Sequence, residues 1–119
     1  MRIGIYGYGN LGHGIESEVS KNSDMQLVAI FTRREPKTLR TNSDVPVYST
    51  DDVMQFKGKI DVMIMCGGSA FDLPHQTPEL AKHFNVIDSF DNHANIPQHL
   101  KNVDEPAKEA GNIALISCG

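Results

Sequence analysis

A glycine-rich hexapeptide near the start of the chain constrains the fold more than any other feature. Gly7, Gly9 and Gly12 form a GxGxxG pattern that follows a short strand-like run at 2–6 and opens an amphipathic segment at 10–21. A strand, a tight glycine turn and a helix in this order are typical of a dinucleotide-binding unit. In that unit Gly7 makes the turn, Gly9 lets a pyrophosphate approach the backbone, and Gly12 permits close helix–strand packing. The helix N-terminus then offers N–H groups and partial positive charge to phosphate, although a glycine turn without a ligand is the alternative.

Strand-like and helix-like segments alternate along the rest of the chain. Strands are expected at 2–6, 26–31, 45–48, 61–66, 85–87 and 113–116, and helices at 10–21, 51–56, 73–83 and from Pro97 onward. The last helix should present Leu100, Val103 and Ala107 on one face, should kink or divide at Pro106, and should be capped by Gly111. Such alternation predicts an α/β fold, a Rossmann-type doubly wound parallel sheet.

The 119 residues are enough for one domain, 1–119. Ligands of such sheets bind outside the carboxyl ends of the strands, and this chain stops directly after its last expected strand. We therefore expect an NADP(H)-binding domain truncated from a longer enzyme, with the substrate domain missing. A naturally small protein is the alternative.

Composition excludes several classes of function. The net charge of −4 argues against a nucleic-acid or anionic-membrane surface, and no secretory signal or membrane-length apolar run is present. Two cysteines without a CxxC pattern fit a reducing compartment, which predicts a cytoplasmic protein. The five histidines lack metal-ligand spacing, so they are expected mostly at the surface and no metal site is predicted.

The end of the second strand indicates which dinucleotide is bound. NAD sites place Asp or Glu about 20 residues past the glycine loop, on the ribose 2′-hydroxyl. Here Thr32, Arg33 and Arg34 occupy that place, and Glu35 follows them. A hydroxyl and two guanidinium groups suit a 2′-phosphate, so the pattern favours NADP over NAD, although a solvated basic turn is the alternative.

Two further strand ends carry candidate site residues. Cys66, Gly67, Gly68 and Ser69 follow the fourth strand, where glycines allow close approach and Ser69 offers a hydrogen bond; an ordinary turn is equally compatible. Cys66 itself is interpreted as a small buried hydrophobic residue. The mostly polar run 88–93 follows the fifth strand, and Asp91 could pair with the ammonium group of an amine substrate; capping or turn chemistry is the alternative.

Together these segments resemble meso-diaminopimelate D-dehydrogenases. The resemblance covers nearly the whole chain and is carried by Ile3–Gly12, Phe31–Arg34, Cys66–Ala70, Asp72–Pro74, Val86–His93, Asn95–Pro97 and Ala110–Asn112. The Gly-Tyr-Gly-Asn-Leu-Gly loop and the Asp-Ser-Phe-Asp-Asn-His run in one chain are much more specific than a general Rossmann pattern.

The resemblance implies an NADP-dependent oxidative deamination of the D-centre of meso-2,6-diaminopimelate, giving L-2-amino-6-oxopimelate and ammonia. It implies that the cofactor is lined by Gly7, Tyr8, Gly9, Asn10, Leu11, Gly12, Thr32, Arg33, Arg34, Cys66, Gly67, Gly68, Ser69, Ser89, Phe90 and Asp91. Asp91 is the expected catalytic residue, and Asp91 and Asn95 are the expected substrate contacts, the latter where some relatives carry Asp. The family is homodimeric at full length.

Two other kinds of function remain open on the residues alone. One is another NADP-linked reductase of the dihydrodipicolinate reductase or homoserine dehydrogenase type, against which the run 88–93 argues. The other is a non-catalytic NADP-sensing domain.

Overall fold

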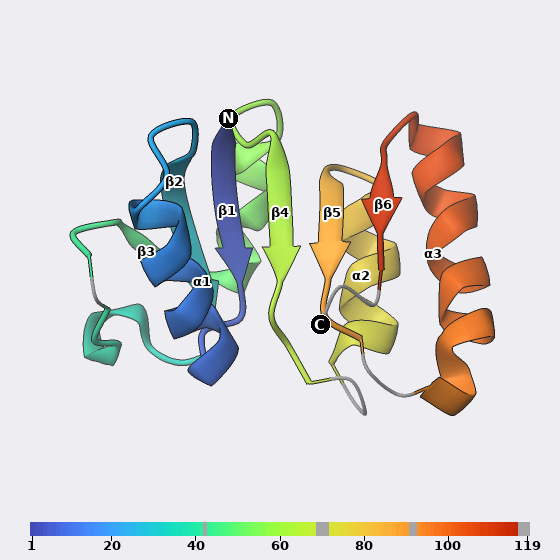
Figure 1. Ribbon diagram of the computed structural model, residues 1–119, viewed down its shortest axis with the longest axis horizontal. Helices are drawn as coiled ribbons and strands as arrows, with labels where there is room; N and C mark the ends of the chain where they lie inside the picture. Colours follow the sequence, from blue (N-terminus) through green and yellow to red (C-terminus); the bar gives the residue numbers. More distant parts are fainter. Residues whose placement is uncertain (42, 69–71, 91–92, 117–119) are drawn as a thin grey trace.

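The computed structural model describes residues 1–41, 43–68, 72–90 and 93–116. Its regular elements alternate between strand and helix along the chain (Figure 1). In chain order they are β1 (Arg2–Tyr6), α1 (Asn10–Ser20), β2 (Gln26–Thr32), η1 (Pro36–Thr38), β3 (Val47–Ser49), η2 (Thr50–Phe56), β4 (Val62–Met65), α2 (Leu73–Ala81), β5 (Asn85–Asp88), η3 (His93–Asn95), α3 (Ile96–Ala110) and β6 (Ala114–Leu115).

The strands form one parallel sheet in the order β3-β2-β1-β4-β5-β6. Strand order reverses direction between β1 and β4, and this topological switch point is where such sheets bind ligands. All strands end at the lower edge in Figure 1, so the segments that follow β1, β2, β4 and β5 gather there. The predicted doubly wound Rossmann-type sheet is confirmed.

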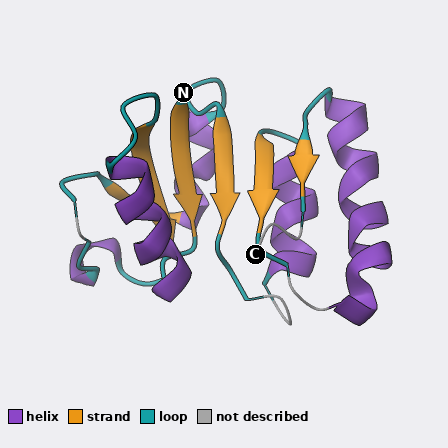
Figure 2. Ribbon diagram, viewed as in Figure 1, coloured by secondary structure: helices purple, strands orange, loops and turns teal. Residues whose placement is uncertain are grey.

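Helices cover both faces of the sheet, as Figure 2 shows. On one face η2, α2 and α3 enclose the larger core, which includes Phe31, Met63 and Leu80. On the other face α1 lies against β1 and β2, over a smaller cluster built on Ile5 and Ile30. Because helices cover both faces of the sheet, successive side chains of a strand such as β4 all face protein, and its sequence is therefore continuously apolar.

The last helix differs from the prediction in two respects. It is one helix from Ile96 to Ala110 with Pro106 inside it, so a division into two helices is wrong. A proline removes one backbone hydrogen bond, but the helix keeps a continuous buried face against α2. That face carries His99, Val103 and Ala107, whereas Leu100 is 50% exposed. Gly111 does cap the helix, with a left-handed φ of 74°.

Shorter elements shift by a few residues from their expected bounds. The third strand is displaced toward its C-terminal side, to 47–49, and the expected helix at 51–56 is a 3₁₀ helix that starts at Thr50. The side chain of Ser49 accepts the Asp51 N–H at 3.2 Å and so begins that helix. In the described part of the chain, no helix has the length and apolar character needed to cross a membrane.

Candidate functional site

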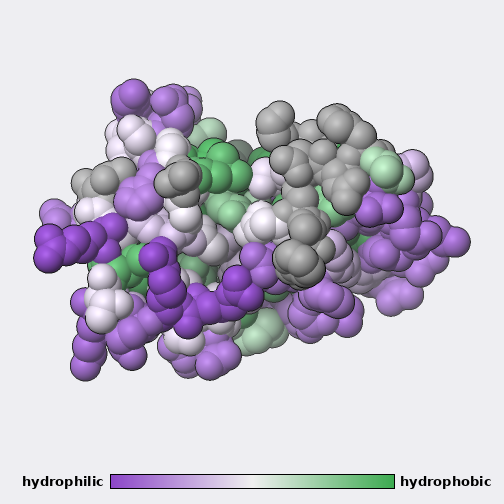
Figure 3. Space-filling view, turned by 90° about the horizontal axis from the view of Figure 1, so that it is seen from below, coloured by the Kyte–Doolittle hydropathy of each residue, from purple (hydrophilic) through white to green (hydrophobic). Residues whose placement is uncertain are grey.

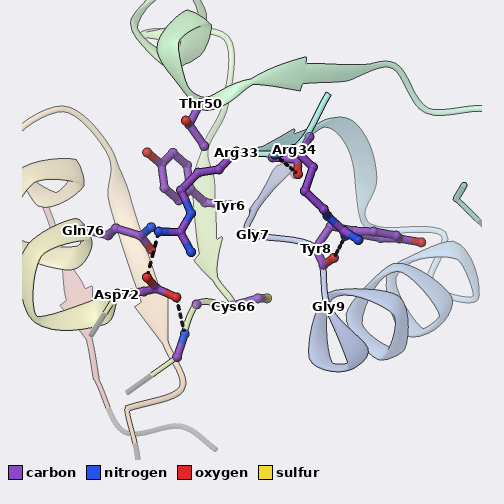
Figure 4. A pocket seen from close by; sticks show the side chains of 13 residues that line it. Tyr6, Gly7, Tyr8, Gly9, Arg33, Arg34, Thr50, Cys66, Asp72 and Gln76 are labelled. Carbon is purple, nitrogen blue, oxygen red and sulfur yellow. Dashed lines mark hydrogen bonds and ion pairs between the residues drawn. The ribbon is translucent and has the colours of Figure 1, made fainter. Parts of the chain in front are cut away.

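A cavity of about 410 Å³ opens at the carboxyl ends of β1, β2 and β4, at the switch point of the sheet. Figure 3 looks onto this edge, where hydrophilic side chains surround smaller apolar patches. The cavity is lined by Tyr6, Gly7, Tyr8, Gly9, Thr32, Arg33, Arg34, Thr50, Cys66, Gly67, Gly68, Asp72 and Gln76 (Figure 4). Nine of these thirteen lining residues were predicted as cofactor contacts, so the fold brings distant segments of the sequence to one place.

The glycine loop has the geometry of a phosphate-binding turn. Gly7 has a φ of +95°, and a Cβ there would stand 3.3 Å from the Gly67 nitrogen. A Cβ on Gly12 would approach the Gly7 oxygen to 2.9 Å, whereas one on Gly9 would meet nothing within 4 Å. Gly7 and Gly12 are therefore required by turn conformation and packing, while the backbone at Gly9 faces open space that a ligand can enter.

The N-terminus of α1 points its first N–H groups toward this space. The helix begins at Asn10, and its N-cap residue is Gly9, which has no side chain that could accept a hydrogen bond from the first turn. The first N–H groups of an α-helix have no partner four residues back, so they remain available to an anion.

The end of β2 supplies two cations. The buried Thr32 side chain accepts the Arg34 backbone N–H at 3.1 Å, which turns the chain after the strand. The Arg34 guanidinium donates to the Tyr8 carbonyl, and Arg33 Nη1 lies 3.0 Å from Asp72 Oδ1. Figure 4 shows the two side chains diverging, with Arg33 crossing the cavity and Arg34 lying over the glycine loop. The Arg33 side chain stays 67% exposed, so the pair leaves guanidinium surface accessible to a ligand.

The start of α2 contributes residues that the sequence analysis did not assign to the site. Asp72 lies beside the first turn of α2, and its carboxylate accepts the Gly68 N–H at 3.1 Å as well as pairing with Arg33. Gln76 lies one turn further, with its buried Oε1 lacking a hydrogen-bond partner among the described residues. The signal that could have located them is Asp72 before Leu73-Pro74, a helix-start pattern placed just after a glycine turn.

Burial raises the pKa of two other lining side chains, which are neutral at pH 7. Burial raises the pKa of the Cys66 thiol to about 12, so it is a protonated, unreactive group at neutral pH. Burial also raises the pKa of the Tyr6 phenol, with a hydrogen bond to Thr50 acting in the opposite direction. Both findings agree with Cys66 as a packing residue and leave Tyr6 as a neutral wall of the cavity.

The end of β5 is organised differently from the expectation of an open polar run. Asp88 is buried, with its Oδ2 2.6 Å from His99 Nε2 and its Oδ1 accepting the Phe90 N–H at 3.3 Å. The Phe90 ring is buried and stacks on the His99 ring at 4.1 Å. The expected surface position is therefore wrong for His99, because a buried carboxylate requires a buried donor.

The remaining predicted site residues lie partly outside this cavity. Leu11, Gly12, Ser89 and Phe90 are not among its lining residues, and Asn95 is exposed before α3. The Ser89 hydroxyl donates to the Met65 carbonyl at 3.4 Å, which ties β5 to β4. Ser69 and Asp91 lie outside the described residues, as does the side chain of Asn10. Among the residues that are described, no three His, Cys, Asp or Glu side chains group as metal ligands.

Comparisons with known proteins agree with this geometry. The sequence profile of a family described as CoA binding domain matches residues 1–74. The chain is 55% identical over 119 residues to a meso-diaminopimelate D-dehydrogenase of Ureibacillus thermosphaericus. The match covers 100% of this chain and 36% of the relative.

Solved structures show the same likeness. C. glutamicum DAP dehydrogenase in complex with DAP is 41% identical and superposes with a TM-score of 0.91, over 100% of this chain and 36% of that one. An engineered D-amino acid dehydrogenase bound to NADP⁺ gives the same identity, TM-score and coverage. The chain thus spans about a third of the length of the proteins it matches.

Proposed function

The chain belongs to the CoA-binding domain family, and from this premise we propose that it is the NADP(H)-binding part of a meso-diaminopimelate D-dehydrogenase. The observation that carries the proposal is the end of β2, where Thr32, Arg33 and Arg34 border the cavity at the switch point. Thr32 stands where an NAD site would carry a carboxylate, and the two cations suit the extra phosphate of NADP.

The residues of the cavity fit this cofactor. The N-terminus of α1 and the open space at Gly9 would accept the pyrophosphate. Each guanidinium has five N–H donors and uses few of them in its contacts with Asp72 and the Tyr8 carbonyl, so Arg33 and Arg34 would bind the 2′-phosphate with the others. Gly67 and Gly68, which also line the cavity, would pass close to the nucleotide.

The proposed reaction is oxidation of meso-2,6-diaminopimelate at its D-centre, with water, to L-2-amino-6-oxopimelate and ammonia. The bound nicotinamide would supply the hydride acceptor, and the protein would supply position and charge. We assign Asp91, three residues after the end of β5 in the sequence, to binding the ammonium group of the substrate, with Asn95 as a second polar contact. The likeness to the Ureibacillus and C. glutamicum enzymes supports this substrate over those of other NADP-linked reductases.

We further propose that the full-length enzyme is homodimeric, as the resemblance of the sequence implies, and cytoplasmic, as its two cysteines without a CxxC pattern suggest. The net charge of −4 on these 119 residues fits a small-molecule substrate better than a nucleic acid.

Calorimetry on the 119-residue chain tests the cofactor. We expect NADPH to bind more tightly than NADH by about tenfold or more, since only NADPH offers a phosphate to the two arginines. CoA, which the family description suggests as a ligand, is the comparison. CoA binding tighter than NADPH, or equal affinity for NADPH and NADH, would overturn the assignment.

A chimera tests the reaction. Residues 1–119 replace the matching 36% of the Ureibacillus enzyme, and NADP⁺ reduction is followed with meso-diaminopimelate. We expect reduction with the meso isomer, none with the L,L isomer, and none by the 119-residue chain alone. Turnover by the chain alone would contradict the proposal that the reaction also needs substrate contacts beyond Asp91 and Asn95, from outside these 119 residues.

A further inference from the structure

A buried carboxylate lies behind the glycine loop, and the sequence analysis gave it no role. Glu16 is on α1 and is 0% exposed. Its Oε1 accepts the Tyr8 hydroxyl and its Oε2 accepts the Ser43 hydroxyl. Burying a carboxylate costs free energy unless hydrogen-bond donors replace its water. Glu16 adds no apolar surface to the core, so its benefit to the protein must come from the hydrogen bonds that it accepts.

Tyr8 connects this carboxylate to the cofactor site. It occupies the first variable position of the GxGxxG loop, lines the cavity and is itself buried. Its ring lies 4.1 Å from the His13 ring, and a Cβ on Gly12 would come within 3.1 Å of it. The ring is thus packed against the first turn of α1, and its hydroxyl is fixed by Glu16.

The hydrogen bonds around Tyr8 have a defined direction. Because the Tyr8 hydroxyl donates to Glu16, its oxygen accepts from His13 Nδ1 at 2.9 Å. The Tyr8 carbonyl accepts from the Arg34 guanidinium. Tyr8 therefore connects to Glu16 on α1 and, through Glu16, to Ser43 by its side chain, and to the proposed 2′-phosphate site by its backbone carbonyl.

The charge of Glu16 cannot itself favour this ligand. A negative charge behind a phosphate-binding loop repels phosphate, so removing the charge alone would strengthen binding. Any benefit to binding must come through geometry, by holding the loop in its binding conformation before the ligand arrives.

We propose that Glu16 is a positioning residue for NADP(H): by holding the Tyr8 hydroxyl it fixes the glycine loop for the pyrophosphate and, through the Tyr8 carbonyl, fixes Arg34 for the 2′-phosphate. This inference rests on the proposed function of the same site and adds a residue that does not touch the ligand.

The test compares the NADPH and NADH affinities of five variants with those of wild type by calorimetry, well below every melting temperature. We expect Glu16→Ala to weaken NADPH binding by about tenfold or more, and NADH binding less, because Arg34 is also released. Glu16→Gln keeps an acceptor for Tyr8 and should stay within about threefold of wild type. Glu18→Ala, at an exposed position two residues on, is the matched control and should not change either affinity.

Tyr8→Phe removes only the hydroxyl and supplies the second arm. It should weaken NADPH binding as Glu16→Ala does, and the double variant should lose no more than the larger single loss, since both break one connection. Should Glu16→Ala not fold, Tyr8→Phe decides alone. A folded Glu16→Ala or Tyr8→Phe protein with wild-type affinity, or one that binds NADPH more tightly, overturns the role of Glu16. Wild type that fails to bind NADPH overturns the proposed function instead.

Discussion

Replacing His99 by Phe should destabilise the domain strongly, although His99 is not itself among the expected ligand contacts. The His99 side chain is 3% exposed and lies 2.6 Å from a fully buried Asp88 carboxylate. Since a carboxylate accepts, Nε2 carries the proton. Phe keeps a ring against Phe90 but removes the donor. Breaking a buried pair by removing one partner costs about 3–5 kcal/mol, and the Phe90 N–H that remains on Asp88 places this case at the lower end, about 3 kcal/mol.

Thermal unfolding followed by circular dichroism measures this loss. An unfolding entropy of about 2.1 cal/mol/K per residue over 119 residues is about 0.25 kcal/mol/K, so the melting temperature should fall by about 12 °C. His75→Phe, at an exposed position on α2, is the control and should shift it by less than about 2 °C. Asp88→Asn/His99→Phe should melt above His99→Phe, because the amide still accepts the Phe90 N–H without a buried charge. A melting temperature of His99→Phe within about 3 °C of wild type would refute the reasoning.

Three further predictions concern the cofactor, the substrate and the pH dependence of stability. Arg33→Ala/Arg34→Ala should weaken NADPH binding by about tenfold to a hundredfold and leave NADH nearly unchanged in calorimetry, whereas Arg40→Ala should change neither; equal losses for both cofactors contradict the 2′-phosphate assignment. In the chimera, Asp91→Asn should lower kcat/KM for the diamino acid with NADPH affinity intact, and normal kinetics with a lower melting temperature would instead identify a helix cap. The hydrogen bonds from Arg2 hold the pKa of Asp61 at about 2, below its ordinary 3.8. Its stabilisation is therefore present above about pH 4 and lost as pH falls through 2, so wild type and Asp61→Asn should differ in melting temperature at pH 6 and converge near pH 2; a constant difference would exclude the pair as the cause.

Local patterns predicted most of the fold because each depends on near neighbours. The turn after β1 is encoded locally, because position 7 has a φ of +95° beside the end of β4, and glycine is the residue type that adopts this φ without steric cost. Apolar runs of strand length and a left-handed glycine after the last helix likewise mark their elements within a few residues.

Residues that line the cavity could be predicted where their distance in the sequence from the glycine loop fixes their place, and not where tertiary packing fixes it. Thr32, Arg33 and Arg34 follow from their distance to the glycine loop, because strand and helix lengths fix that spacing. Asp72 and Gln76 were missed because nothing in the sequence pairs α2 with the end of β2; the Arg33 contact arises only when β4 is placed beside β1.

The sequence by itself determined a parallel α/β sheet with a glycine turn between β1 and α1 and two arginines after β2, since these depend on residue type and short spacing. Only the tertiary structure decided which polar residues are buried. Nothing in the sequence marks Asp88 or Glu16 as buried, yet each accepts from a donor on another element, His99 on α3 and Ser43 before β3. A buried charge is tolerated only where the fold brings such donors to it. A local sequence pattern cannot show which donors these are, because they come from other elements.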